Sequence, residues 1–262
     1  MQLPYPIRTL GQRVLGSVRV PVRSGINRGY RWSIVSTGRG YGSGAFGRQR
    51  IGALQAVVQP GECFFDLGAH KGFMALAASR MVGPEGTVVA VEPGRSNLWF
   101  LRHHVRWNRV PNVRIVHAAV GAESGTVTFG GRGDSLAYQV GVGEDTVALM
   151  SVPQIAAQER VPPPTVIKMD IEGHELDALR GALPVLGPDL VLLISIHSRP
   201  LYDGCSALLE ERAFTLFPSW EIQRRLSGEV EEWGGDHDLL AVGSGRRFDE
   251  AEIANLPLMT GR

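Results

Sequence analysis

The sequence predicts an α/β fold with a mostly parallel sheet, closed at its C-terminal end by an antiparallel hairpin and preceded by an N-terminal extension. From residue 62 onward, short apolar runs alternate with stretches whose apolar residues have helical spacing, the order expected of parallel strands joined by helices. The chain has 262 residues, of which 44% are hydrophobic, enough to bury a sizeable core. We expect residues 1–60 to form an extension or lid and residues 61–262 to form the ligand-binding domain.

The N-terminal extension stands out by its charge. No acidic residue precedes Glu62, whereas nine arginines do, so residues 1–61 carry a formal charge of +9 within a chain whose net charge is +1. Such a segment can bind an anionic substrate, a membrane surface or the acidic body of its own chain. Apolar residues at helical spacing predict a helix over 51–58, which Pro60 and Gly61 terminate.

The remaining elements follow in chain order. The expected strands are 62–67, 87–91, 113–120, 165–169 and 190–196, and the expected helices are 73–82, 96–108, 151–160, 174–186 and 206–217. The strand over 190–196 is apolar throughout, as is typical of a central strand covered on both faces. We expect segments 220–226 and 238–242 to pair as the closing hairpin.

Composition excludes several classes of protein. Two cysteines, Cys63 and Cys205, cannot form a framework of disulfides, which favours a reducing cytoplasm. The longest apolar run is far shorter than the roughly 18 residues typical of a membrane span. The start of the chain has no continuous apolar stretch of the kind that secretory signals contain. We therefore expect a soluble cytoplasmic protein, with no nucleic acid as partner.

A glycine-containing turn follows the first strong strand. Asp66, Gly68, Ala69 and Gly72 lie between that strand and its helix, where glycines allow close approach of a ligand and the helix presents unpaired amides. Glu92 ends the next strand, twenty residues past Gly72, where a carboxylate can hold a ribose diol. Together these features predict a site for a ligand that contains adenosine.

The composition of the turn indicates which adenosine ligand binds. Dinucleotide sites have glycine where this turn has Asp66, and that carboxylate would repel a pyrophosphate but suit a cationic ligand. S-adenosylmethionine, which carries an ammonium and a sulfonium centre, meets this requirement. Ala118 and Ala119 end the third strand, and their small side chains leave a slot for adenine. No phosphate-binding loop of the Gly-x-x-x-x-Gly-Lys type is present.

Several motifs resemble those of the FkbM-type family of class I S-adenosylmethionine-dependent methyltransferases. They are Asp66–Gly72, Val91-Glu-Pro93 with Asn97, Val116–Gly121, Ile167-Lys-Met-Asp-Ile-Glu-Gly-His-Glu175, Ile194–His197 and His237–Leu240. The resemblance implies the Rossmann-like, seven-stranded class I fold. It also implies O-methyl transfer to a small molecule, sugar, glycan or natural product, with Asn97 in the cofactor site. His70 departs from the family, which commonly has Asn there.

Acidic and histidine side chains follow the later strands, where we expect the acceptor. Asp170 and Glu172 follow one strand, His197 follows the next, and His237 begins the closing strand. Carboxyl ends of parallel strands meet at one edge, so we expect these groups to converge. Asp170 would also contact the cofactor. An alcohol is a poor nucleophile while it keeps its proton, and either His197 acts as general base or the four residues bind a divalent ion such as Mg²⁺ or Mn²⁺.

Two other functions remain open at this point. The strand, glycine turn and acidic residue also occur in NAD(P)-dependent oxidoreductases and epimerases, although Asp66 argues against that class. A non-catalytic adenosine-binding module is the third hypothesis, and the grouping of Asp170, Glu172 and His197 argues against it. The sequence identifies neither the acceptor nor the oligomeric state, so a homo-oligomer is among the arrangements that it allows.

Overall fold

A seven-stranded sheet forms the centre of the protein. The computed structural model describes residues 15–38, 40–130, 139–141, 145–230, 233 and 237–261. The strand order is β12-β13-β11-β10-β3-β4-β5. Within this sheet β3, β4, β5, β10 and β11 are parallel, while β13 runs antiparallel to both β11 and β12. The strands are β3 (Cys63–Leu67), β4 (Thr87–Val91), β5 (Val113–Val116), β10 (Val166–Met169), β11 (Val191–Ile196), β12 (Phe214–Pro218) and β13 (His237–Gly243). The predicted α/β class and mostly parallel sheet are confirmed.

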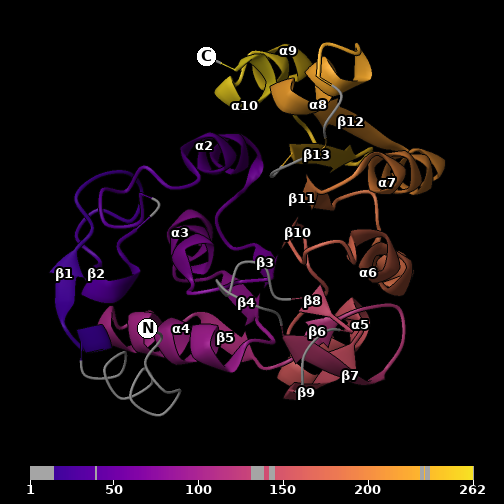
Figure 1. The fold of residues 1–262 in the computed structure, drawn as a ribbon. Helices are drawn as coiled ribbons and strands as arrows, with labels where there is room; N and C mark the ends of the chain where they lie inside the picture. The colour runs from indigo at the N-terminus through magenta and orange to yellow at the C-terminus, as the bar shows by residue number, and fades with distance from the viewer. Residues whose placement is uncertain are drawn as a thin grey trace.

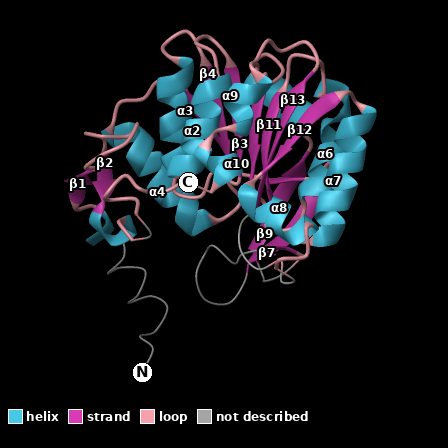
Figure 2. Cartoon of the chain, turned by 90° about the horizontal axis from the view of Figure 1, so that it is seen from above, coloured by secondary structure: helices cyan, strands magenta, loops and turns pink. Residues whose placement is uncertain are grey.

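Helices cover both faces of this sheet (Figures 1 and 2). They are α2 (Arg48–Val57), α3 (Phe73–Val82) and α4 (Arg95–Trp107) on one face, α5 (Val152–Glu159), α6 (Glu175–Ala182) and α7 (Arg199–Glu211) on the other, and α8 (Trp220–Leu226), α9 (Glu250–Ala254) and α10 (Pro257–Thr260) near the C-terminus. The side chains of β11 are buried along its whole length, which explains its unbroken apolar sequence.

The described residues before 61, which are 15–38 and 40–60, pack against one face of the sheet and add side chains to the core. Strands β1 (Arg19–Pro21) and β2 (Arg31–Ser33) form an antiparallel pair, and Trp32 and Leu54 are fully buried in the same hydrophobic cluster as α3. His104 of α4 accepts a hydrogen bond from the Ser33 amide at 3.0 Å, and its other ring nitrogen lies 2.8 Å from the Lys71 carbonyl. This histidine therefore ties the N-terminal segment to α4.

A second sheet extends beyond the predicted alternation. Its strands are β6 (Ala119–Val120), β7 (Gly125–Gly130), β8 (Gln139–Val140) and β9 (Asp145–Met150), in the order β6-β9-β7-β8. The single strand predicted over 113–120 is thus two, because the chain leaves the main sheet after Val116 and pairs with β9 from Ala119.

Two predictions near the C-terminus were wrong, one in the bounds of a helix and one in the type of element. The helix expected over 206–217 is α7, which begins at Arg199, and Phe214–Pro218 is a strand. Segment 220–226 is the helix α8 and not a strand, so β12 takes its place as the partner of β13. Ser219 precedes α8 in extended conformation, and Ile222 is the buried residue of its helical face.

Within the described part of the chain, no helix combines the length and the apolar character needed to cross a membrane.

Candidate active site

A cavity opens at the carboxyl ends of β3 and β4. Its lining includes Gly68, His70, Glu92, Asn97, Ala118, Ala119, Phe129, Asp170 and Glu172. Glu92 is buried, and its two carboxylate oxygens accept hydrogen bonds from the amides of His70 at 2.7 Å and Gly94 at 2.8 Å. Burial raises the pKa of Glu92, and these bonds together with one from Asn97 only partly offset that effect. These hydrogen bonds hold the Glu92 carboxylate in place at the wall of the cavity.

Two details of this cavity fit a polar ligand. The Asn97 amide nitrogen donates to Glu92 at 3.1 Å, while its oxygen is buried and accepts no hydrogen bond among the described residues. A buried acceptor without a donor is costly, so a ligand hydroxyl or amine would satisfy it. At Gly68, where φ is +78°, a Cβ atom would lie 1.9 Å from the Asp170 carbonyl oxygen, so only glycine lets the ends of β3 and β10 approach this closely.

The residues predicted to bind the cofactor divide into two groups. Gly68, Glu92, Asn97, Ala118, Ala119 and Asp170 line the cavity. Asp66, Ala69 and Gly72 are not among its lining residues. Gly72 instead has φ +89° and faces Leu101, where a side chain would collide. These three residues belong to the strand and turn that support the cavity, but they do not line it.

Asp66 is buried inside the sheet and paired with a lysine. Lys168 Nζ lies 3.2 Å from Asp66 and 3.8 Å from Asp170. Burial lowers the pKa of Lys168, but the two carboxylates outweigh this and raise it, so the lysine is charged. Lys168 therefore offsets the charge of Asp66, and Asp66 does not line the cavity, so its expected repulsion of a pyrophosphate stays a prediction.

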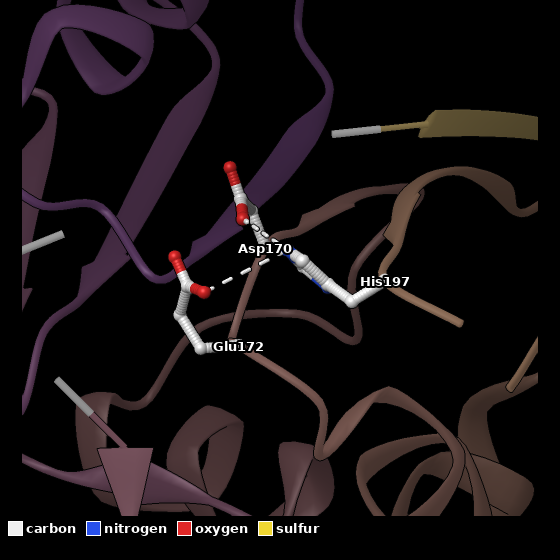
Figure 3. Close-up of side chains that lie close together, drawn as sticks. All are labelled: Asp170, Glu172 and His197. Carbon is white, nitrogen blue, oxygen red and sulfur yellow. Dashed lines mark ion pairs between the residues drawn. The ribbon is translucent and has the colours of Figure 1, made fainter. Parts of the chain in front are cut away.

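Asp170, Glu172 and His197 converge as predicted (Figure 3). Asp170 follows β10 and His197 follows the adjacent parallel strand β11. His197 Nε2 lies 3.8 Å from both Asp170 Oδ1 and Glu172 Oε2. One ligand atom from each of the three residues lies within 4.8 Å of the others. Since Asp170 and Glu172 also line the cavity, the cluster and the cavity share a wall.

Glu175 holds this cluster in place from the start of α6. It is fully buried, and one of its oxygens accepts hydrogen bonds from the Ile171 and Gly173 amides and lies 3.2 Å from His197 Nδ1. Burial lowers the pKa of His197, but Glu175, followed by Asp170 and Glu172, outweighs it and raises the pKa to about 9. At neutral pH the imidazole is thus protonated, and in that form it cannot accept another proton.

His237, the fourth predicted metal ligand, lies outside the described cluster. It pairs with Ile196 across the antiparallel strands, and its ring lies 5.8 Å from that of Trp233. The next residue, Asp238, accepts hydrogen bonds from Arg50 and Ser195. Successive side chains of a strand point to opposite faces, so His237 faces away from the side on which Asp238 meets Arg50.

Arg50 is a site residue that the sequence reasoning missed. Its Nε lies 2.8 Å from Asp238 and its Nη1 lies 3.5 Å from Asp170, and its side chain is 11% exposed. Burial raises the pKa of Asp170, but Lys168 and Arg50 outweigh it and hold the pKa below its ordinary value. Part of the basic N-terminal segment therefore binds the acidic body of the same chain, one of the three outcomes considered for it.

Lys168 and Phe129 were also missed. Lys168 had a signal in the sequence, because it is one of only two lysines among 27 basic residues and directly precedes Met169-Asp170. Phe129 lies in β7 of the second sheet, which the strand pattern did not predict, and so gave no such signal.

Comparison with known proteins shows which protein family the sequence matches. The sequence profile of the "Methyltransferase FkbM domain" matches residues 66–223. The hexuronic acid methyltransferase AglP of Haloferax volcanii is 28% identical over 108 residues, which are 41% of this chain and 39% of that protein. The matched region thus spans well under half of that relative's length.

Two solved structures that align with this chain are a methyltransferase and a protein that binds S-adenosyl-L-methionine. Methyltransferase FkbM from Methylobacillus flagellatus KT aligns with a TM-score of 0.50 and 21% identity, over 71% of this chain and 48% of that chain. Fibrillarin from Aeropyrum pernix, solved with natively bound S-adenosyl-L-methionine, aligns with a TM-score of 0.45 and 16% identity, over 74% of this chain and 73% of that one. At 21% identity, the likeness to the Methylobacillus flagellatus structure is one of fold alone.

Proposed function

The chain belongs to the FkbM methyltransferase family, and from this premise we propose that it is an S-adenosylmethionine-dependent O-methyltransferase. The acceptor that we propose is a hydroxyl group of a sugar, glycan or other small natural product. The observation that carries the proposal is the shared wall: Asp170 and Glu172 line the cavity beside Glu92 and also meet His197. A hydroxyl at this wall would face a cofactor held in the cavity.

The cavity residues suit this cofactor. Glu92 can accept from ribose hydroxyls, and the unsatisfied Asn97 oxygen offers a further acceptor. Ala118, Ala119 and Phe129 line the cavity, and two small side chains with an aromatic ring form a lining that suits adenine. When bound, S-adenosylmethionine supplies an electrophilic methyl group. The protein's part is to orient the acceptor oxygen in line with that group and to remove its proton.

Removal of that proton can follow either of the two routes considered. His197 is poorly suited to act alone as a base, because its pKa of about 9 keeps it protonated at neutral pH. Asp170, Glu172 and His197 together form a set of carboxylate and imidazole ligands that fits Mn²⁺ or Mg²⁺. A divalent ion, when bound, lowers the pKa of a coordinated hydroxyl. We therefore propose that these three residues hold a divalent ion, with His197 deprotonated and oriented by Glu175.

The acceptor class has support from the curated relative. AglP is named a hexuronic acid methyltransferase, and a sugar hydroxyl is one of the acceptors that the family resemblance implies for this chain. We place the acceptor on the side of Asp170 that faces α2 and β13, where Arg50 reaches the carboxylate.

Calorimetry tests the proposal. Metal-stripped protein is titrated with S-adenosylhomocysteine and with NAD, and the former titration is repeated with Mg²⁺ and with Mn²⁺. We expect micromolar binding of S-adenosylhomocysteine and none of NAD. Preferential binding of NAD would refute the methyltransferase assignment and favour the oxidoreductase alternative.

A variant pair separates an enzyme from a binding module. We expect His197→Ala to bind S-adenosylhomocysteine as the wild type does, to bind Mn²⁺ at least tenfold more weakly, which is a loss of about 1.4 kcal/mol, and to lose turnover. His103→Ala, on the outer part of α4, should behave as the wild type in all three measurements. Unchanged Mn²⁺ affinity in His197→Ala would exclude the proposed ion site, and full turnover in that variant would exclude a catalytic role for His197.

A further inference from the structure

A second cavity lies between the start of α2 and the C-terminal elements. Its walls are residues 45–50 at the start of α2, Glu221 of α8, Asp238 of β13 and Leu258 of α10, and its volume is about 350 Å³. This volume falls within the range of small-molecule sites. Helix α10 packs against α2, and Figure 1 shows α2 beside the C-terminal elements that complete the cavity.

This cavity is linked to the cluster described above through one side chain. Arg50 lines the cavity, and its guanidinium group spans the gap between Asp238 and Asp170, at 2.8 Å and 3.5 Å. Asp170 in turn lines the cofactor cavity. Arg50 therefore stands between the second cavity and Asp170, and an acceptor ring in that cavity would reach the wall of Asp170 and Glu172 with a hydroxyl that extends past this side chain.

The lining of the second cavity has a balanced polarity. Arg48 and Arg50 offer donors, Glu221 and Asp238 offer acceptors, and Gln49 offers both. The formal charges of these four ionisable groups cancel, so the cavity gives no net attraction for an anion such as a phosphate. Phe46 and Leu258 add apolar surface. Donors and acceptors in similar number, beside an apolar surface, match the hydroxyl groups and C–H faces of a sugar ring.

We infer that the second cavity is the acceptor site and that it binds a polyhydroxylated, sugar-like ring. The inference deepens the proposed function and rests on it for the identity of the reaction. An apolar aromatic acceptor would cover Arg48, Gln49 and Glu221 without offering them hydrogen bonds. A sugar ring, by contrast, can donate to Glu221 and accept from Arg48 and Gln49.

Saturation-transfer NMR tests the site with two defined probes, methyl β-D-glucopyranoside and sodium D-glucuronate at millimolar concentration. The full chain is measured with and without saturating S-adenosylhomocysteine. Gln49→Trp places a large ring in the cavity from the exposed start of α2. Gln158→Trp is the matched control, since Gln158 is exposed on α5 on the opposite face of the sheet. S-adenosylhomocysteine affinity is measured for all three proteins by calorimetry.

We expect the wild type and Gln158→Trp to bind at least one of the sugars, and Gln49→Trp to bind it at least tenfold more weakly, a loss of about 1.4 kcal/mol. The affinity for S-adenosylhomocysteine should be the same in all three proteins, which also shows that they are folded. Equal sugar binding in Gln49→Trp and wild type, or no binding of either sugar to the wild type, would overturn the inference. Failure of S-adenosylhomocysteine to bind, with sugar binding still sensitive to Gln49→Trp, would refute the methyltransferase proposal and leave the sugar site standing.

Discussion

Replacement of Gly68 by alanine tests whether the junction of β3 and β10 determines the geometry of the site. The new Cβ atom would lie 1.9 Å from the Asp170 carbonyl oxygen, whereas ordinary contacts begin at 3.4 Å. The two strand ends would have to separate by about 1.5 Å, the difference between these distances. This displacement would move Asp170 away from both the cavity and His197.

The expected cost has two parts. An alanine at φ +78° loses about 1–2 kcal/mol from backbone strain, and relief of the collision adds roughly 1–3 kcal/mol. Gly61→Ala is the matched control, because Gly61 has φ +87° and open space around its Cβ position. Gly61→Ala should therefore lose only the unfolding free energy that backbone strain costs.

Urea unfolding and calorimetry measure the two consequences. We expect Gly68→Ala to lose about 2–5 kcal/mol of unfolding free energy, against about 1–2 kcal/mol for Gly61→Ala. S-adenosylhomocysteine should bind Gly68→Ala at least tenfold more weakly, about 1.4 kcal/mol, and bind Gly61→Ala normally. If the two variants were equal in stability and in affinity, the close approach of Gly68 to Asp170 would have no energetic role.

Two further predictions concern buried ionisable groups. Burial lowers the pKa of His104 from 6.5 to about 3, so below pH 6.5 the unfolded chain takes up a proton that the folded chain does not. Between pH 7 and pH 5 the wild type should lose about 2 kcal/mol more unfolding free energy than His104→Gln, and parallel urea curves would contradict this. Glu175→Gln keeps an oxygen for the Ile171 and Gly173 amides but loses the charge beside His197. Mn²⁺ affinity should fall about 10–100-fold in calorimetry, with exposed Glu210→Gln as control, and unchanged affinity would exclude an orienting role for Glu175.

The parts of the fold that the sequence predicts are those whose pattern is local. Strands such as Val191–Ile196 and helices such as Phe73–Val82 were predicted to within about a residue, because a continuous apolar run or a helical spacing lies within the element itself. The prediction of a strand over 220–226 was wrong because the apolar residues at 220, 222 and 226 fit a strand and a short helix almost equally well. The second sheet was missed because β6 and β8 have only two residues each and the side chains of β7 and β9 are mostly not buried.

The same distinction explains what could be predicted of the site. Asp170 and His197 follow recognisable strands, and the geometry of parallel strands brings their ends to one edge. The contact between Arg50 and Asp238 joins residues 188 positions apart. This contact depends on how α2 packs against the end of the sheet, and the spacing of residues within a single element does not predict such packing. The pairing of Lys168 with Asp66 also required the register of β10 against β3.

The ion pair between Arg50 and Asp238 bears on how the gene can be trimmed. The profile match begins at residue 66, which suggests that a shortened chain could start near there. Such a fragment would keep Asp238 but lose the guanidinium group that compensates its buried charge, at a cost of about 3–5 kcal/mol for a broken buried pair. It would also lose Leu54 and Trp32 from the core. The matched domain of this chain therefore shares its interior with residues that precede it, and a fragment meant to fold must include α2.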